Sequence, residues 1–130
     1  YKIDFSYDQM VMVEADEYEI FQVIYNLVNN AINYTGDDKQ IWVCQIVRED
    51  GYVRIEVTDS GEGIAPEALP YVWDRYYKVD KTHKRAVMGT GLGLSIVKNI
   101  LELHDARYGV ESEVGKGSTF WFELKVYQIV

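Results

Sequence analysis

The sequence contains one cysteine and no long apolar run, and each scarcity excludes a class of protein. Because Cys44 stands alone, the chain can form neither an internal disulfide nor a cysteine-based zinc site, and its apolar neighbours favour a core thiol. No stretch approaches the roughly 20 apolar residues of a membrane-spanning helix. We see no signal peptide either, and the start at Tyr1 rather than at Met predicts a piece of a longer protein.

Positive charge is also scarce, with 13 Lys and Arg against 21 Asp and Glu and a formal net charge of −8. Binding to nucleic acid or to an anionic membrane surface needs a basic face, so we expect neither partner. A small anionic ligand stays compatible, because charges more than about 8 Å away are largely screened at physiological salt. The basic residues do cluster in one short segment, which holds Lys78, Lys81, Lys84 and Arg85.

What the sequence has is a hydrophobic share of 48% and clear local periodicity, which predict one packed α+β domain over residues 1–130. Apolar stretches predict strands at residues 1–7, 11–13, 41–47, 52–59, 108–113 and 118–126. We expect these strands to pair as three hairpins in chain order, with glycines at the second and third turns. Helices and strands do not alternate strictly, so we expect a two-layer α/β sandwich with helices on one face of a mixed sheet.

Three helices are expected between these strands. Asp16 is predicted to cap the first, with Glu19 completing a capping box, and the helix runs to about Tyr34. Pro66 is placed in the first turn of a short second helix. A third helix is predicted over residues 92–104.

Asparagines crowd the first expected helix at four positions, Asn26, Asn29, Asn30 and Asn33. A solvated helix face would normally carry Glu, Lys or Arg, because Asn is a mediocre helix former. Positions 26, 30 and 33 share one side of the helix. A polar outer face explains any single asparagine, but the group favours a ligand site, since an amide oxygen is a hard neutral ligand suited to Mg²⁺.

Asp59 ends an expected strand and is followed by a glycine-broken loop over residues 60–65. A carboxylate at this point can accept a hydrogen bond from an exocyclic amine, while the glycines let backbone approach a flat ring. Taken alone, Asp59 is explained better by an Asx turn after a strand. The base-binding interpretation therefore depends on the other motifs.

A second glycine repeat, at residues 89–94, opens the expected helix 92–104. Backbone N–H groups at a helix N-terminus form an anion site, helped by the helix dipole. The repeat is not a dinucleotide-binding fingerprint, because a basic segment rather than a strand precedes it. Residues 78–88 lack apolar periodicity and are expected to form a mobile loop, whose four cations favour a phosphate-binding lid over a plain solvated loop.

Taken together and in this order, the motifs resemble the Bergerat-type ATP-binding fold. Histidine kinases, type II topoisomerases, large heat-shock chaperones and MutL-type mismatch-repair proteins share that fold. Residues 26–35 resemble its asparagine box, 59–64 its first glycine box, 73–78 its aromatic box, 89–97 its second glycine box and 111–120 its closing hairpin. The resemblance covers nearly the whole chain.

The resemblance implies a role for each residue that matches a motif. Asn30 would hold Mg²⁺ with Asn26 beside it on the phosphate side, and these two with Lys78 would be the catalytic residues. Asp59 would read the adenine amino group, and Thr119 would support the adenine end through water. The remaining nucleotide contacts would come from Asn33, Tyr34, Gly61, Gly63, Ile64, Tyr77, Lys78, Gly89, Thr90, Gly91, Leu92, Gly93 and Leu94.

One substitution indicates the subfamily. The hydrolytic relatives place a Glu base one helical turn before the metal-binding asparagine, and Asn26 occupies this position here. Because an amide cannot take a proton from water, the resemblance implies a domain that binds ATP but hydrolyses it poorly. It implies a protein-histidine kinase instead, whose phosphoryl group goes to a histidine on a separate dimerisation domain of the same parent and reaches a response regulator indirectly. His83 and His104 do not lie in such a motif.

Asn33 keeps a second hypothesis open, because many relatives have a phosphate-contacting Lys at this position. The alternative is a degenerate ATP-binding regulatory module without phosphoryl transfer. A third hypothesis, an ATPase of the chaperone or topoisomerase type, predicts steady-state hydrolysis by the chain alone. The resemblance also implies a cytoplasmic domain of a membrane-anchored parent, with ATP and Mg²⁺ as ligands and no direct contact between this domain and the membrane.

Overall fold

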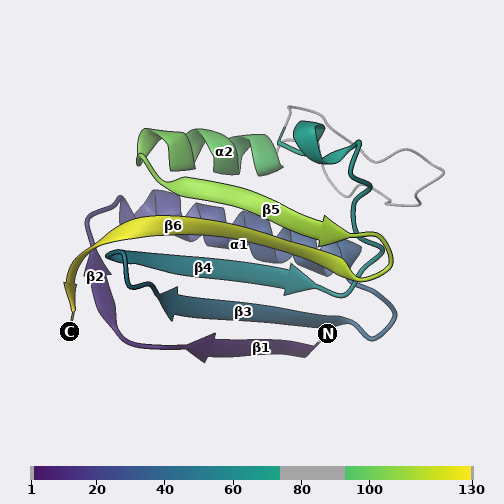
Figure 1. The fold of residues 1–130 in the computed structure, drawn as a ribbon, viewed down its shortest axis with the longest axis horizontal. Coiled ribbons are helices and arrows are strands. Elements are labelled where there is room, and N and C mark those ends of the chain that lie inside the picture. The colour runs from purple at the N-terminus through teal and green to yellow at the C-terminus, as the bar shows by residue number, and fades with distance from the viewer. Residues whose placement is uncertain (1, 74–92, 130) are drawn as a thin grey trace.

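The computed structural model describes residues 2–73 and 93–129, which form a mixed sheet and a layer of helices (Figure 1). In chain order the elements are β1 Lys2–Tyr7, β2 Val11–Val13, α1 Glu17–Tyr34, β3 Gln40–Val47, β4 Tyr52–Asp59, a 3-10 helix Leu69–Tyr71, α2 Gly93–Leu103, β5 Arg107–Glu113 and β6 Gly117–Ile129. The strands follow the order β1-β3-β4-β6, and β5 and β2 share the far edge of the long β6. The predicted α+β sandwich is confirmed.

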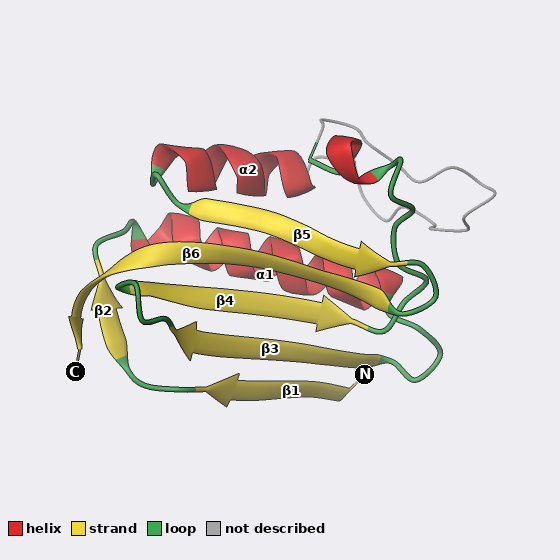
Figure 2. Ribbon diagram, viewed as in Figure 1, coloured by secondary structure: helices red, strands yellow, loops and turns green. Residues whose placement is uncertain are grey.

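One apolar core lies between the sheet and the helices. In Figure 2, α1 runs behind the strands and α2 packs beside it. Both helices turn one stripe inward, and the strands meet it with every second side chain. The most deeply buried side chains are Val23, Leu27, Ile41, Val57, Val97, Leu101 and Phe122. Each such side chain stabilises the fold by about 1.5–3 kcal/mol relative to an exposed position.

Two of the three predicted hairpins are confirmed. β3 pairs with β4 and β5 pairs with β6, in both cases antiparallel. Gly51 in the β3–β4 turn has φ +88° and Gly115 in the β5–β6 turn has φ +84°, a backbone region that favours glycine. Local turn chemistry therefore predicted these pairs correctly.

The hairpin predicted between the first two strands is wrong. β1 lies parallel to β3 at one edge of the sheet, whereas β2 pairs with the end of β6 at the other edge. Gln45 explains the divergence, because it anchors the link between β1 and β2 to β3. Its carbonyl and side-chain oxygens both accept from the backbone N–H of Asp8, at 3.1 and 2.8 Å, and its Nε2 donates to the Gln9 carbonyl at 2.7 Å. The chain is thus led past the sheet edge instead of folding back on β1.

α1 begins at the predicted cap but with half of the predicted capping box. The Asp16 carboxylate accepts from the backbone N–H of Glu19 at 2.9 Å, as expected. The Asp16 N–H donates to Nε2 of His104 at 3.1 Å, so the reciprocal bond from Glu19 is replaced. Nδ1 of His104 lies 2.9 Å from the Ile100 carbonyl oxygen, which places the ring proton on Nδ1. The histidine therefore ties the start of α1 to the end of α2.

The short helix starts later than predicted. Residues 66–68 form a turn, closed by the N–H of Ala68 donating to the Ala65 carbonyl at 2.9 Å, and the 3-10 helix follows it with Pro70 as its second residue. Pro66 therefore belongs to the turn. α2 matches the predicted third helix from Gly93 onward, whereas Leu92 and the predicted mobile loop at residues 78–88 lie outside the described residues.

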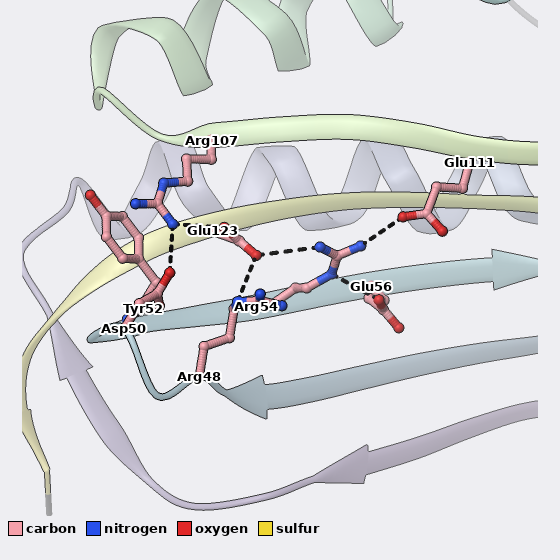
Figure 3. Close-up of polar contacts among 8 residues, drawn as sticks. All are labelled: Arg48, Asp50, Tyr52, Arg54, Glu56, Arg107, Glu111 and Glu123. Atoms are coloured by element: carbon pink, nitrogen blue, oxygen red, sulfur yellow. Dashed lines mark hydrogen bonds and ion pairs between the residues drawn. The ribbon is translucent and has the colours of Figure 1, made fainter.

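The sheet face opposite the helices carries a group of paired charges (Figure 3). We call its eight residues the Glu123 cluster: Arg48, Asp50, Tyr52, Arg54, Glu56, Arg107, Glu111 and Glu123. Alternation along β6 turns Glu123 to this face, yet only 4% of it is exposed. Its carboxylate lies 3.3 Å from Nε of Arg48, 3.3 Å from Nη1 of Arg54 and 3.4 Å from Nη1 of Arg107. One buried carboxylate thus gathers three cations.

Arg54 extends the cluster along the sheet. It donates to Glu56 at 2.8 Å and to Glu111 at 3.2 Å, and its guanidinium stacks 4.1 Å from the centroid of the Trp121 ring. Burial lowers the pKa of Arg54, but the hydrogen bonds to Glu56, Glu123 and Glu111 outweigh it and the pKa is raised. The charge of Arg54 is therefore fully compensated by protein groups.

Arg107 closes the other end of the cluster. Its Nη1 lies 2.8 Å from Oδ2 of Asp50, and its guanidinium lies 3.6 Å from the centroid of the Tyr52 ring. The hydrogen bond from Arg107 lowers the pKa of Asp50, and the same bond raises the pKa of Arg107. Charges in the cluster face one another, an arrangement typical of a structural role.

Candidate functional site

Three of the four asparagines of α1 differ from the fourth in burial. Asn26, Asn30 and Asn33 are half-buried, whereas Asn29 is exposed. This burial agrees with the predicted shared side at i, i+4 and i+7. The structure therefore distinguishes three of the four asparagines from a solvated polar face.

Asn30 has a polar atom without a hydrogen-bond partner in the described part of the chain. Its Nδ2 is buried and makes no hydrogen bond to any of the described residues. Leaving a buried donor unsatisfied costs about 1–3 kcal/mol, and such groups are rare in folded proteins. Residues 2–73 and 93–129 therefore leave this amide donor unsatisfied.

Asp59 is the last residue of β4 and is only 1% exposed. Its Oδ1 accepts a hydrogen bond from the backbone N–H of Gly61 at 2.9 Å, which is the predicted Asx turn. The turn and a ligand-reading role are compatible, since a carboxylate has about four acceptor positions. A desolvated carboxylate in a fixed orientation discriminates strongly between donors and acceptors on a ligand.

The glycines after Asp59 let segments of the chain pack closely. A Cβ on Gly61 would collide with the carbonyl oxygen of Tyr34, the last residue of α1. Gly63 has φ +78°, and a Cβ there would collide with the carbonyl oxygen of Glu113 at the end of β5. Both glycines are thus required by contacts within the protein. Their predicted framing of a base stays a prediction.

Side-chain hydroxyls join the C-terminal end of α1 to the loop after β4. Thr35 caps α1, and its Oγ1 donates to the Gln40 carbonyl at 2.9 Å and lies 3.2 Å from Oγ of Ser60. The Ser60 hydroxyl also hydrogen-bonds to Oδ1 of Asp38. Tyr34, half-buried beside these residues, stays a predicted nucleotide contact. The asparagine-bearing helix and the Asp59 loop are therefore connected by hydrogen bonds.

The β5–β6 hairpin forms the other side of this region. In the sheet register Ser118 is the partner of Asp59, and Ser112 is the partner of Ser118. Thr119 is turned to the opposite face, where its Oγ1 lies 2.9 Å from Oγ1 of Thr58. The structure thus does not bring Thr119 to Asp59. Sequence reasoning missed Ser118 and Ser112, because identifying them requires the registers between β4 and β6 and between β5 and β6.

Several predicted site residues lie outside the described residues: Tyr77, Lys78, Gly89, Thr90, Gly91 and Leu92. The basic residues Lys81, Lys84 and Arg85 and most of the aromatic box lie there too. Trp73, the first residue of that box, is described and packs edge-on against Tyr108 and Phe120, with ring centroids 5.1 and 5.5 Å apart. Gly93 and Leu94 form the exposed and half-buried start of α2. The roles predicted for these residues stay predictions.

The residues at this site fit a magnesium–nucleotide complex. Mg²⁺ prefers hard oxygen ligands and keeps most of its waters, so a single amide oxygen from Asn30 suffices as a protein ligand. The amide nitrogen of Asn30, which lacks a protein partner among the described residues, is a donor of the kind that phosphate oxygens accept. The donor chemistry on α1 therefore matches both parts of the complex.

Comparison with protein families gives a match over most of the chain. A model of the histidine kinase-, DNA gyrase B- and HSP90-like ATPase family matches residues 15–128. Among curated proteins, drug sensory protein A of Synechocystis sp. is 42% identical over 118 residues, which is 84% of this chain and 18% of that protein. Sensor protein SrrB of Staphylococcus aureus is 43% identical over 122 residues, 92% of this chain and 20% of that protein. The chain spans about a fifth of the length of these relatives.

Solved structures give the same fold. Full-length ShkA in complex with AMPPNP matches with a TM-score of 0.83 and 28% identity, over 98% of this chain and 26% of that one. The catalytic domain of histidine kinase ThkA, in a nucleotide-free form, matches with a TM-score of 0.76 and 33% identity, over 95% of this chain and 78% of that one. A mycobacterial sensor histidine kinase, MprB, has a TM-score of 0.85 at 23% identity, over 98% of this chain and 86% of that one, and so supports the fold alone.

Proposed function

The chain belongs to the histidine kinase-, DNA gyrase B- and HSP90-like ATPase family, and on that premise we propose that it is the catalytic domain of a sensor histidine kinase. In this role it binds Mg-ATP and supplies the γ-phosphoryl group to a histidine on a separate dimerisation domain of the parent protein. Its relatives in sequence are named as sensor proteins, and one similar structure contains the nucleotide analogue AMPPNP.

The observation that carries the proposal is the buried amide of Asn30. The chain keeps this side chain on the inner flank of α1 with Nδ2 unsatisfied by the described residues, at a cost in stability. A ligand that supplies both a cation and anionic oxygens satisfies both ends of the amide at once. Mg-ATP is such a ligand, and Mg²⁺ would neutralise phosphate charge in the complex.

Asn26 is the residue that favours phosphoryl transfer over ATP hydrolysis in this proposal. It lies one helical turn before Asn30 and is half-buried on the same flank. A neutral amide there can hold a phosphate oxygen or a water, but it cannot accept the proton that an attacking water must lose. The chain's own contribution is therefore to bind, orient and shield the triphosphate, with Asn26, Asn30 and Lys78 as the proposed catalytic residues.

Asp59 is the proposed reader of the base. Its carboxylate is held by the Gly61 N–H and is desolvated, so it accepts from an exocyclic amine and repels an oxo group. This predicts a preference for ATP over GTP. Tyr34, Gly61, Gly63 and Ile64 complete the proposed base contacts.

The proposal extends to the parent protein, of which we take this chain to be one domain. We propose a cytoplasmic domain of a membrane-anchored parent, which hands its phosphoryl group on to a response regulator after the histidine. Among the residues that the structure describes, no helix has the length and apolarity to cross a bilayer.

A transfer experiment tests the function. The chain is mixed with the dimerisation domain of its parent and with Mg-ATP labelled at the γ-phosphate, and label is followed on that domain's histidine. We expect label to appear there and to be absent when that histidine is replaced. Tight ATP binding without transfer would favour the degenerate regulatory module that Asn33 keeps open, and steady-state phosphate release by the chain alone would favour an ATPase of the chaperone or topoisomerase type.

A further inference from the structure

A row of three polar side chains crosses the sheet beneath the loop that follows β4. Asp59 on β4, Ser118 on β6 and Ser112 on β5 are successive partners in the strand register. Side chains opposite one another in register point to the same face of a sheet, here the face that packs on the helices. Ser118 is 2% exposed and Ser112 is half-buried, so the row is shielded from water.

The Ser112 hydroxyl has all of its hydrogen-bonding capacity in use. It accepts from the backbone N–H of Ile64 at 2.7 Å, lies 3.0 Å from the carbonyl oxygen of Gly117 and lies 2.8 Å from Oγ of Ser118. A hydroxyl has one proton and two lone pairs. Since the Gly117 carbonyl can only accept, the arrangement that satisfies all three contacts has Ser112 donating to it and Ser118 donating to Ser112.

The loop that carries Ile64 is docked on the hairpin at three points. The N–H of Gly115 donates to the Glu62 carbonyl at 2.7 Å, Gly63 packs against the backbone of Glu113, and the N–H of Ile64 binds Ser112. The first two contacts are made by backbone atoms, which a substitution of side chains leaves in place. Ser112 supplies the third contact through its side chain. This contact holds Ile64, which lies at the end of the loop away from Asp59.

We propose that Ser112 is a positioning residue for base recognition, which sets the selectivity for adenine without touching the nucleotide. It fixes the position of the Ile64 backbone relative to the Asp59 carboxylate. The proposed contact of Ile64 with the base and the proposed hydrogen bond from the base to Asp59 can then form at the same time. This role rests on the proposed function, since it presupposes that the base lies against the Asp59 loop. Buried recognition of this kind is sensitive to displacements of about 1 Å.

The test compares ligands with and without a base. Calorimetry measures the dissociation constants of Mg-ATP, Mg-GTP and magnesium tripolyphosphate for the unmutated chain and for Ser112→Ala. We expect the substitution to weaken Mg-ATP binding about tenfold, because the Ile64 N–H loses its buried acceptor. We expect the preference for ATP over GTP to narrow by a similar factor, while the affinity for tripolyphosphate stays unchanged.

Two further variants make the result specific. Ser112→Thr keeps the hydroxyl and should restore both ATP affinity and base preference. Thr58→Ala removes a hydroxyl contact of 2.9 Å on the opposite sheet face and should change neither. Where Ser112→Ala does not fold, Ser112→Cys keeps the volume with a weaker acceptor and should shift base preference in the same direction.

The outcomes separate this role from the function on which it rests. A folded Ser112→Ala or Ser112→Cys variant with unchanged ATP-over-GTP preference would overturn the positioning role alone. Equal losses for ATP and tripolyphosphate would overturn it as well, because they indicate a general structural effect. Absence of ATP binding by the unmutated chain would overturn the proposed function and, with it, this role.

Discussion

Two polar regions lie on opposite faces of the same sheet. They differ in whether the described residues supply a partner for each buried polar group. The Glu123 cluster, on the open face, pairs a buried carboxylate with three arginines, two of which also contact further carboxylates and aromatic rings. The site on the helix face keeps the Asn30 Nδ2 buried without a partner among the described residues. The difference indicates that polarity alone does not mark a functional site, whereas an incomplete buried polar group does.

The same contrast appears in the neighbours of each region. The cluster is held by long, flexible side chains that reach one another across three strands, β4, β5 and β6, and the β3–β4 turn (Figure 3). The site is held by short side chains and backbone atoms at a sheet end, where glycines permit close approach of the chain. Short groups leave little freedom to rearrange, so the candidate site is held in a defined geometry. Substitutions in the two regions should therefore affect different measurements.

The largest expected effect is a loss of stability from the cluster. Glu123→Gln keeps the shape of the side chain but removes the charge that Arg48, Arg54 and Arg107 share. We expect a fall of about 3 kcal/mol in the free energy of unfolding, because a buried ion pair loses one partner. Urea denaturation measures it, and the affinity for Mg-ATP of the folded variant should not change.

Glu111→Gln is the matched control within the cluster. The Glu111 side chain is 72% exposed and pairs with Arg54 at 3.2 Å. Surface pairs contribute about 0–1 kcal/mol, so this variant should unfold close to the unmutated chain. Equal losses for the two variants would show that burial of Glu123 is not what makes the cluster important.

The next substitution should lower the affinity for Mg-ATP and leave stability unchanged, the reverse of the result expected for Glu123→Gln. Asn30→Ala removes the proposed metal ligand, and we expect Mg²⁺-dependent ATP affinity to fall about 100-fold. The free energy of unfolding should stay the same or rise slightly, because an unsatisfied buried amide is removed. Asn29→Ala, at the exposed asparagine, is the control and should leave affinity unchanged. A stability loss in Asn30→Ala without loss of ATP affinity would assign the amide to the fold.

A smaller effect is expected from Asp59→Asn. The new amide keeps an oxygen that can accept from the Gly61 N–H. Its NH₂ group, however, places a donor where the carboxylate is proposed to accept from the amine of the base. We expect ATP affinity to fall about 20-fold and the preference for ATP over GTP to decrease, as measured by competition with a fluorescent nucleotide. Asp37→Asn, at an exposed position, should have neither effect. Equal affinity of the unmutated chain for ATP and GTP would remove this role of Asp59.

The smallest effect concerns pH and the exposed end of the cluster. The hydrogen bond from Arg107 lowers the pKa of Asp50 below its ordinary value of 3.8 in the folded state. Its contribution is therefore fully present above that value and is lost as the pH falls through the lower folded-state pKa. The difference in Tm between the unmutated chain and Asp50→Asn should shrink between about pH 5 and pH 2. A difference that is independent of pH would mean that the charge of Asp50 plays no part, and Glu49→Gln serves as the control.

Local features of the chain could be predicted from the sequence, and long-range ones could not. The β3–β4 turn, the Asp16 cap and the end of β4 at Asp59 each depend on a few adjacent residues. The separation of β1 from β2 depends on Gln45, more than 30 residues away, and no local signal announces it. The Glu123 cluster could not be predicted for the same reason, because its members are distributed over β4, β5, β6 and the β3–β4 turn.

The site shows the same division. Spacing on one helix predicted the asparagine flank, including Asn30, whose Nδ2 is buried. The partner of Asp59 required the register between β4 and β6. The family resemblance assigned a role to Thr119, whereas the register pairs Asp59 with Ser118. A slip of one position in a strand reverses the face, so strand residues are the ones for which sequence reasoning needs the structure most.

The most direct test of the account follows the Asn30 side chain itself by NMR during a titration with Mg-ATP. We predict that its amide resonances shift until binding is saturated and that their hydrogen exchange slows, while those of Asn29 stay in place. Saturable nucleotide binding that leaves the Asn30 amide unperturbed would contradict the claim that this group awaits a ligand.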